Sequence, residues 1–322
     1  MKTKVVILAA TALLLVSCGR EIVERPGDES VDISFTAGGF TRGSEITGPA
    51  GMATAGFCVW AYNYTGFWAS AASKTIIINN TGLGHGRVTS GDGGLTWSYG
   101  TPQMWPGNRV SFFAYAPYGA ATPTGVDGQG VPTISYTIPD NVANQVDLLI
   151  ADHVLDRIGP TPVNEMFRHA LSRVSFSALK SANVSGVVKV TSIEVRNIYN
   201  DGSTVLKTPV LWNVNNLSTG APVITIVNGL LQNLALTTTV QNVLSPGGTM
   251  FLMPQTLDAT AEIVVTYTID ALELSWTSPI PSPSVWEAGK SYNYQLLIDT
   301  DLVMVILGQL ESPWDGPGWG NY

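Results

Sequence analysis

Short runs of alternating apolar and polar residues recur along most of the chain. Residues 31–35 (VDISF) alternate with a period of two, and residues 187–197 (VVKVTSIEVRN) do so over a longer stretch. This period is typical of a β-strand with one buried face. Clusters of Gly, Pro and Asn separate the runs, as expected for turns. The pattern therefore predicts many short strands joined by tight connections.

Other runs are rich in β-branched and aromatic residues, among them 56–64 (GFCVWAYNY) and 109–116 (RVSFFAYA). Together these patterns predict an all-β chain of the sandwich or barrel class with little helix. Residues 163–172 are the best candidate for a short helix, although their pattern is ambiguous, and Asp270-Ala271 lies near the turn of a hairpin. The predicted strands are 31–35, 56–64, 74–79, 95–99, 109–116, 133–138, 146–151, 173–178, 187–197, 222–227, 249–253, 261–269, 272–277, 291–299 and 302–307.

The first residues differ from the rest of the chain. Two Lys precede an apolar run at 5–16, which is too short to span a bilayer but has the length of a signal-peptide core. Leu15-Val16-Ser17-Cys18 then matches the bacterial lipobox. We expect a signal peptide at 1–17, cleavage between Ser17 and Cys18, and a diacylglycerol on the Cys18 thiol that anchors the protein to a membrane. The polar residues 18–30 are expected to form a flexible tether.

Composition sets limits on size and partners. The chain has 322 residues, 12% of them charged, with a net charge of −8. The length suggests two domains, which we place at 31–160 and 161–322, with the boundary near the Pro-containing stretch 159–162. The low charge fraction argues against intrinsic disorder. The negative balance argues against nucleic acid as a partner, because phosphate contacts need clustered Lys and Arg.

Few residues suggest catalysis or metal binding, and we expect no enzyme activity, no metal and no cofactor. Cys58 lies between large apolar residues and is expected to be a buried small hydrophobe. His153 and His169 have no specific metal spacing, and a hydrogen-bonded structural role is the better interpretation of His169. Asp299 and Asp301 alternate on one strand face, with nothing to place a second acid opposite them.

One loop is a candidate for proteolytic processing. Residues 36–42 (TAGGFTR) follow the first predicted strand and end in a lone Arg among small residues. A cut between Arg42 and Gly43 would detach the strand at 31–35 from the chain. An ordinary solvated arginine is the alternative.

Several motifs, taken in order, resemble the fimbrillin family of the Bacteroidales, the lipoprotein precursors of pilus subunits, and especially its minor-fimbrillin-like branch. Each motif is weak alone, but the ordered set covers nearly the whole mature chain. The motifs are the lipobox at Cys18, VDISF at 31–35 with Thr41-Arg42, WP at 105–106 with VSFFAYAP at 110–117, DLLIA at 147–151, FRHALSRV at 167–174, WEAGKSYNY at 286–294 and PW at 313–314.

This resemblance implies a fold, a location and an assembly mechanism. It implies two tandem transthyretin-like β-sandwich domains and export to the outer membrane as a surface lipoprotein. It also implies removal of the first strand, residues 31–42, after which a strand of another fimbrial subunit fills the opened groove. Val31, Ile33 and Phe35 would fill that groove in the precursor, and Arg42–Gly43 would be the cut.

The sequence favours a structural and adhesive subunit of a cell-surface pilus. The turn-rich end at 312–322 departs from the long donor strand of stalk subunits, so stalk, tip, accessory and anchor roles stay open, as does the surface ligand. The alternative is a monomeric surface lipoprotein that binds glycans through exposed aromatic residues, for which Trp314 and Trp319 are the candidates.

Overall fold

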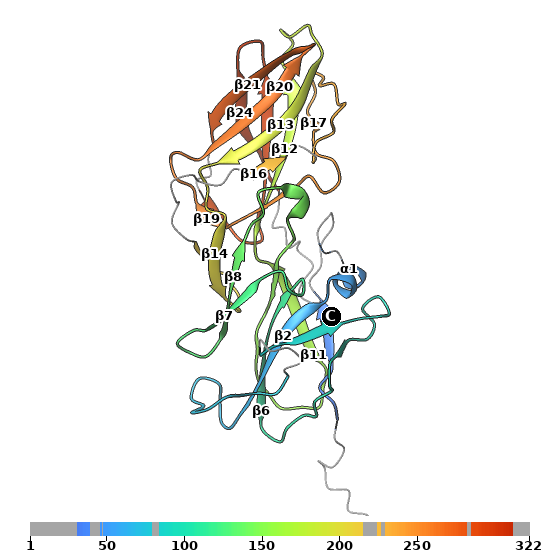
Figure 1. Cartoon of the computed structure of the whole chain (residues 1–322), viewed down its shortest axis with the longest axis vertical. Coiled ribbons are helices and arrows are strands. Elements are labelled where there is room, and N and C mark those ends of the chain that lie inside the picture. The colour runs from blue at the N-terminus through green and yellow to red at the C-terminus, as the bar shows by residue number, and fades with distance from the viewer. Residues whose placement is uncertain are drawn as a thin grey trace, which may run out of the picture.

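The computed structural model describes residues 31–38, 46, 48–78, 84–214, 224–226, 229–281 and 285–311. These residues form an elongated, nearly all-β molecule, as the sequence predicts (Figure 1). The strands of the first half lie at one end and most strands of the second half at the other. The transthyretin-like two-domain arrangement stays a prediction.

The largest sheet among the described residues is built mainly from the first half of the chain. Its strands follow the order β1-β11-β9-β6-β2-β4-β5, with β10 paired to β6 and β3 paired to β2. β1 runs parallel to β11, and the other pairs of this sheet are antiparallel. The bounds are β1 (Phe35–Gly38), β2 (Phe57–Tyr64), β3 (Thr75–Ile76), β4 (Gly86–Thr89), β5 (Ser98–Tyr99), β6 (Arg109–Ala116), β9 (Leu149–Ala151), β10 (Val154–Arg157) and β11 (Val163–His169).

The second half forms two larger sheets and one strand pair. One sheet has the order β17-β12-β23-β24 with β18 beside β12, another the order β16-β13-β20-β21, and β19 pairs with β22. The hairpin turn lies at Asp270-Ala271 as predicted, and Asp270 has φ +54° there. The bounds are β12 (Ser172–Lys180), β13 (Val188–Arg196), β16 (Ile224–Ile226), β17 (Gln241–Asn242), β18 (Met250–Leu252), β19 (Gln255–Thr256), β20 (Glu262–Ile269), β21 (Leu272–Pro279), β22 (Val285–Trp286), β23 (Ser291–Ile298) and β24 (Val303–Glu311).

A further sheet joins the two halves and has the order β15-β14-β8-β7. β14 comes from the second half but pairs with β8 of the first, from Asp201 opposite Thr137 to Val205 opposite Thr133. β11 also lies beyond residue 160 yet pairs within the largest sheet. Strand pairing therefore crosses the boundary placed at 160/161. The bounds are β7 (Thr122–Val126), β8 (Pro132–Thr137), β14 (Asp201–Val205) and β15 (Asn213–Val214), and a short 3-10 helix spans Val142–Asn144.

The expectation of a short helix at 163–172 is wrong. Residues 163–169 form β11, with alternate residues buried from Val163 to His169. Two of the four inward residues, Glu165 and His169, are polar. The pattern of hydrophobic residues therefore does not show the period of two that the buried positions follow.

The helix that does form, α1 (Gly48–Ala55), was not predicted. Pro49 stands in its first turn and Gly56 directly follows it, a pairing that is typical of helix ends. Gly56 has φ +64°, and its N–H donates to the Met52 carbonyl at 2.7 Å. A Cβ on Gly56 would lie 2.9 Å from the Val88 carbonyl oxygen, so only glycine fits at this position.

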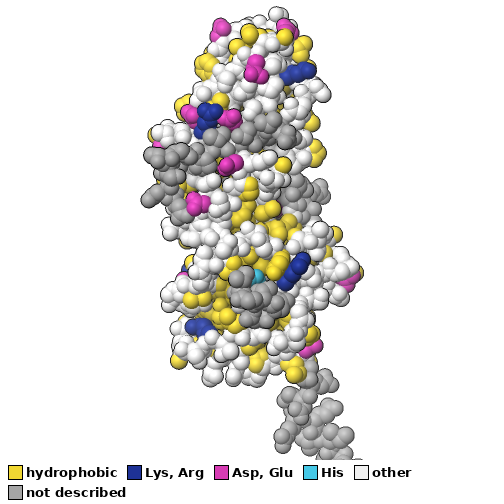
Figure 2. All heavy atoms as spheres, in the orientation of Figure 1, with side chains coloured by type: hydrophobic (Ala, Val, Ile, Leu, Met, Phe, Trp, Pro, Cys, Tyr) yellow, Lys and Arg dark blue, Asp and Glu magenta, His cyan; other side chains and the backbone are white. Residues whose placement is uncertain are grey.

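The largest sheet buries both of its faces. On β2, Cys58 and Trp60 belong to a core shared with the second half, whereas Phe57 and Val59 belong to a second core on the opposite face. Burial on both faces explains why β2 and β6 are dense in apolar residues and do not alternate with a period of two. Figure 2 shows hydrophobic side chains gathered over the region of β2 and α1, with few Lys and Arg on that face.

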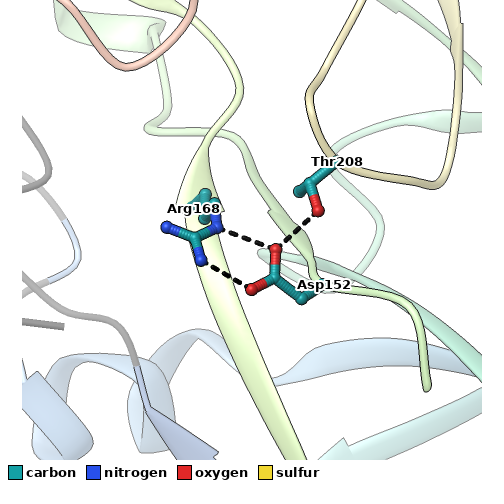
Figure 3. A network of polar contacts seen from close by, with 3 residues as sticks. All are labelled: Asp152, Arg168 and Thr208. Carbon is teal, nitrogen blue, oxygen red and sulfur yellow. Dashed lines mark hydrogen bonds and ion pairs between the residues drawn. The ribbon is translucent and has the colours of Figure 1, made fainter. Parts of the chain in front are cut away.

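A polar network ties the loop after β14 to the largest sheet (Figure 3). Arg168 on β11 donates to both carboxylate oxygens of Asp152 at 2.7 Å, and the Thr208 hydroxyl donates to Asp152 at 2.6 Å. Burial raises the pKa of Asp152, but hydrogen bonds from Arg168 and Thr208 outweigh burial and hold the pKa below its ordinary value.

We predict that Asp152→Asn lowers the free energy of unfolding at pH 7, because it removes the charge that Arg168 pairs with. The expected loss is only about 1–2 kcal/mol, because both side chains are partly exposed and water screens their attraction. The stabilisation from a lowered pKa is present above about pH 4 and is lost as the pH falls through the lowered value. Urea unfolding at pH 7 and pH 3 measures both effects. The exposed Asp140→Asn is the control, and an equal loss in both variants would contradict the assignment.

Candidate functional site

The strongest candidate site is the place that the first strand occupies, which we call the first-strand site. Residues 31–33 lie along residues 103–105: the Ile33 N–H donates to the Gln103 carbonyl at 2.7 Å, and the Trp105 N–H donates to the Val31 carbonyl at 2.9 Å. The chain then passes to β11, where Phe35 stands opposite Val163 and Gly38 opposite Met166. The first strand therefore pairs first with the segment 103–105, which precedes β6 and lies outside the sheet, and then with β11 of the largest sheet.

Two side chains of the first strand enter the second core. Ile33 is 2% exposed and Phe35 is 3% exposed. The Phe35 ring makes edge-to-face contacts with three aromatic rings, at centroid distances of 5.9 Å to Phe57, 5.4 Å to Tyr99 and 5.9 Å to Phe112. The Tyr99 hydroxyl also donates to the Ile33 carbonyl at 2.8 Å. Aromatic packing and backbone pairing thus hold the strand together.

Val31 differs from the expectation that it fills the same site. Val31 is 36% exposed, because the chain at this end lies along residues 103–105 only and has not yet reached β11. Ser34 and Thr36 also face outward, and the Thr36 hydroxyl donates to the Asn164 side chain at 3.2 Å. The inward residues of the first strand are therefore Ile33, Phe35 and the half-buried Ala37.

A buried acid lies opposite the end of the first strand, and the sequence reading missed it. Glu165 on β11 stands opposite Ala37 and is fully buried, on the same face as Val163 and Phe167. Among the described residues neither of its carboxylate oxygens has a hydrogen-bond partner. Burial, with a smaller contribution from the charge of Asp152, raises the pKa of Glu165 to about 8. The signal in the sequence is an acid at an inward position of a period-two strand.

A second buried acid holds the chain just after the first strand. The Ile46 N–H donates to Asp147 Oδ2 at 3.1 Å, and Asp147 Oδ1 lies 2.8 Å from His169 Nδ1. Asp147 and His169 are both almost completely buried. This confirms the structural, hydrogen-bonded role that the sequence favours for His169. Ile46 itself packs against the second core.

Several residues singled out in the sequence lie outside the described residues. These are Ser17, Cys18, Arg42, Gly43, Trp314 and Trp319. Arg42 and Gly43 fall between Gly38, which ends β1, and Ile46, which Asp147 holds. Cys58 is fully buried as expected, and burial raises the pKa of its thiol.

Other surface features offer less for chemistry. One depression of about 420 Å³ lies between β12, β23 and β24, and another of about 290 Å³ lies beside β20 and β21. Neither is lined by an aromatic side chain of the described residues, so neither offers a stacking platform for a sugar. Within the described ranges, no three His, Cys, Asp or Glu side chains group closely enough to hold a metal ion. No helix in those ranges is long and apolar enough to cross a membrane.

Comparison with protein families gives one match that covers most of the chain. A family model described as "Fimbrillin-like" matches residues 55–313. In sequence, the chain is 24% identical over 240 residues to the Fimbrium subunit Fim1C of Phocaeicola vulgatus. That alignment covers 67% of this chain and 61% of the relative, so the chain spans about three fifths of the relative's length.

Solved structures share the fold. A crystal structure of a fimbrial protein from Bacteroides vulgatus has a TM-score of 0.64 at 17% identity, and the match covers 88% of this chain and 99% of that one. A candidate cell adhesion protein from Bacteroides uniformis has a TM-score of 0.57 at 15% identity, with coverage of 90% and 100%.

We predict that Phe35→Ala lowers the free energy of unfolding by about 3–4 kcal/mol, because the ring fills a closed aromatic pocket that cannot collapse around alanine. The neighbouring Ser34→Ala, at an exposed position, should change it by less than about 0.5 kcal/mol. Chemical denaturation of the intact chain measures both. Similar losses in the two variants would show that Phe35 does not hold the strand in place.

We predict that the intact chain loses stability relative to Glu165→Gln as the pH rises from 5 to 8. The pKa of Glu165 is raised on folding, so its favourable protonated state is complete below about pH 4.5 and is lost as the pH rises through about 8. The expected divergence is about 1–4 kcal/mol. Urea unfolding across this range tests it, with the exposed Glu273→Gln as the control. Parallel curves for all three proteins would contradict the assignment.

Proposed function

The chain belongs to the fimbrillin-like family, and from this we propose that it is a structural and adhesive subunit of a cell-surface fimbria that assembles by exchange of its first strand. The observation that carries the proposal is the placement of residues 31–38. They form a short edge segment whose two large apolar side chains, Ile33 and Phe35, complete a core built by the rest of the chain. A strand of another subunit with similar inward residues can bind at this site by the same backbone pairing.

The first strand has the physical features of a replaceable part. Its backbone bonds are of a kind that any extended chain makes, so they do not depend on sequence. Its two large inward side chains, Ile33 and Phe35, each contribute about 1.5–3 kcal/mol through burial. Loss of the strand would leave unpaired backbone groups on β11 and expose Phe57, Tyr99 and Phe112. Such an edge strongly favours uptake of another strand.

In this proposal, maturation begins at the membrane and ends at the first strand. The precursor is exported, cut between Ser17 and Cys18, lipidated on Cys18 and carried to the outer membrane and the cell surface. An Arg-specific protease then cuts between Arg42 and Gly43. Asp147 supports this position of the cut, because its bond to the Ile46 N–H fastens the chain only a few residues beyond Arg42. Trimming then frees the first strand while α1 and the sheet stay in place.

We predict that Arg42→Ala blocks both trimming and assembly. The unaltered protein without its lipidated Cys18 should fall, after limited trypsin treatment, to the mass of a chain that begins at Gly43 and should form SDS-resistant ladders. The Arg42→Ala variant should keep residues 31–38 and stay a monomer, losing at most the tether residues up to Arg20. Intact mass spectrometry and gel mobility measure both results. Arg87→Ala removes an exposed arginine of the folded sheet and is the matched control, which should be trimmed and should assemble normally.

The outcomes separate the candidate functions. Normal polymer from Arg42→Ala would contradict the role of this arginine. A clean cut at Arg42 that yields a stable monomer would contradict self-assembly by strand exchange. That result would favour the alternative, a glycan-binding surface lipoprotein that uses Trp314 and Trp319, and glycan arrays would then test it.

A further inference from the structure

At Glu165, the first strand places an apolar residue opposite a buried polar side chain. Ile33 and Phe35 meet apolar surroundings, and both are almost completely buried. Ala37, the next inward residue, stands opposite Glu165 and offers only a methyl group. The carboxyl group of Glu165 is buried without a hydrogen-bond partner among the described residues. A buried polar group left in this state costs stability, so the first strand is an imperfect occupant here.

The neighbouring basic side chains of β11 have partners other than Glu165. Arg168 uses Nε and Nη2 on the two oxygens of Asp152, and His169 pairs with Asp147. Asp152 adds negative potential at Glu165. The basic residues of β11 therefore do not hydrogen-bond Glu165, and the position of Ala37, directly opposite Glu165, is placed to bring in a side chain that does.

We propose that Glu165 selects the strand that replaces the first strand, and that this strand belongs to a different subunit and carries Lys or Arg at the position of Ala37. The inference rests on the proposed strand exchange. The incoming strand would have a large apolar residue at the position of Phe35 and, two residues later, the basic residue. Residues 31–38 and 291–322 of this chain contain no Lys or Arg, so these segments of a second copy do not meet the requirement.

The contact would act mainly on choice of partner. Backbone pairing gives every extended strand a similar affinity, whereas a charge-assisted hydrogen bond distinguishes a basic side chain from an apolar one. Every strand that fills the site buries Glu165 again, so a basic residue differs from an apolar one at this position only by the hydration that the cation itself loses. An apolar residue at this position would repeat the mismatch that Ala37 leaves.

A double-mutant cycle in the intact chain tests the role of Glu165 without any trimming. Ala37→Lys is compared in the unaltered chain and in the Glu165→Gln background, with unfolding by urea as the measurement. We expect Ala37→Lys to be about tenfold more favourable in the folding equilibrium when Glu165 is present, which is a coupling of about 1.4 kcal/mol. Ala37→Met is the matched control of similar length without charge, and it should show no coupling. Coupling below twofold, or equal coupling for Ala37→Met, would overturn the inference.

Competition between strands tests selection directly. The chain trimmed at Arg42 is offered two peptides of residues 31–38, one with Ala37→Lys and one with Ala37→Met. The lysine peptide should bind about tenfold more tightly, and Glu165→Gln in the trimmed chain should abolish the difference. Equal binding of the two peptides would overturn the inference and leave strand replacement intact. If the released first strand is replaced by neither peptide, the proposed function fails, and the cycle in the intact chain still decides the role of Glu165.

Discussion

The structure depends on one constraint: the largest sheet is apolar on both faces, so each face has to be covered. One face of β2 and β6 packs into the core shared with the second half of the chain, and the sheet that joins β14 to β8 covers part of it. The other face is closed by the first strand and α1, through Ile33, Phe35 and Met52. The two coverings differ in kind. The shared core rests on strands distributed over most of the sequence, whereas the opposite core depends on a short segment near one end of the chain.

Much of this arrangement follows from the sequence, and the exceptions have physical causes. Strands with a clear period of two or a dense apolar run, such as β2, β6, β13 and β20, lie close to where the pattern predicts them. β11 does not, because Glu165 and His169 occupy inward positions and break the apolar pattern. β14 was missed because DGSTV has a polar composition, and its place is fixed by pairing with β8 across the two halves. The pairings β1–β11 and β14–β8 are contacts between distant residues, which local periodicity does not encode.

The sequence predicts the first strand of the candidate site but not its surroundings, because those are contacts between distant residues. Alternation within residues 31–35 identifies a strand with an apolar face, and Phe35 and Ile33 lie on that face. What surrounds them is set by tertiary structure: Tyr99 and Phe112 are far from Phe35 in sequence, and Glu165 reaches Ala37 only through the parallel register of β1 and β11. The buried Asp147 has the same origin, since its bonds join Ile46, His169 and its own loop from three distant segments. A sequence pattern shows that a strand has a buried face, and the fold decides which groups that face meets.

The two buried acids, Asp147 and Glu165, contact the beginning of the chain differently. Asp147 hydrogen-bonds the backbone at Ile46, whereas Glu165 forms no hydrogen bond with Ala37 opposite it. Asp147 has both oxygens engaged, one by the Ile46 N–H and one by His169, so the segment it holds provides a hydrogen bond to a buried carboxyl group. Glu165 has neither oxygen engaged among the described residues, so the segment opposite it leaves a buried acid unsatisfied. Removal of Ile46 from Asp147 would break a hydrogen bond to a buried acid, whereas removal of Ala37 from Glu165 would break none at that side chain. This contrast supports the proposal that residues 31–38 are exchanged and the chain from Ile46 onward is retained, with the cut at Arg42 in the interval between them.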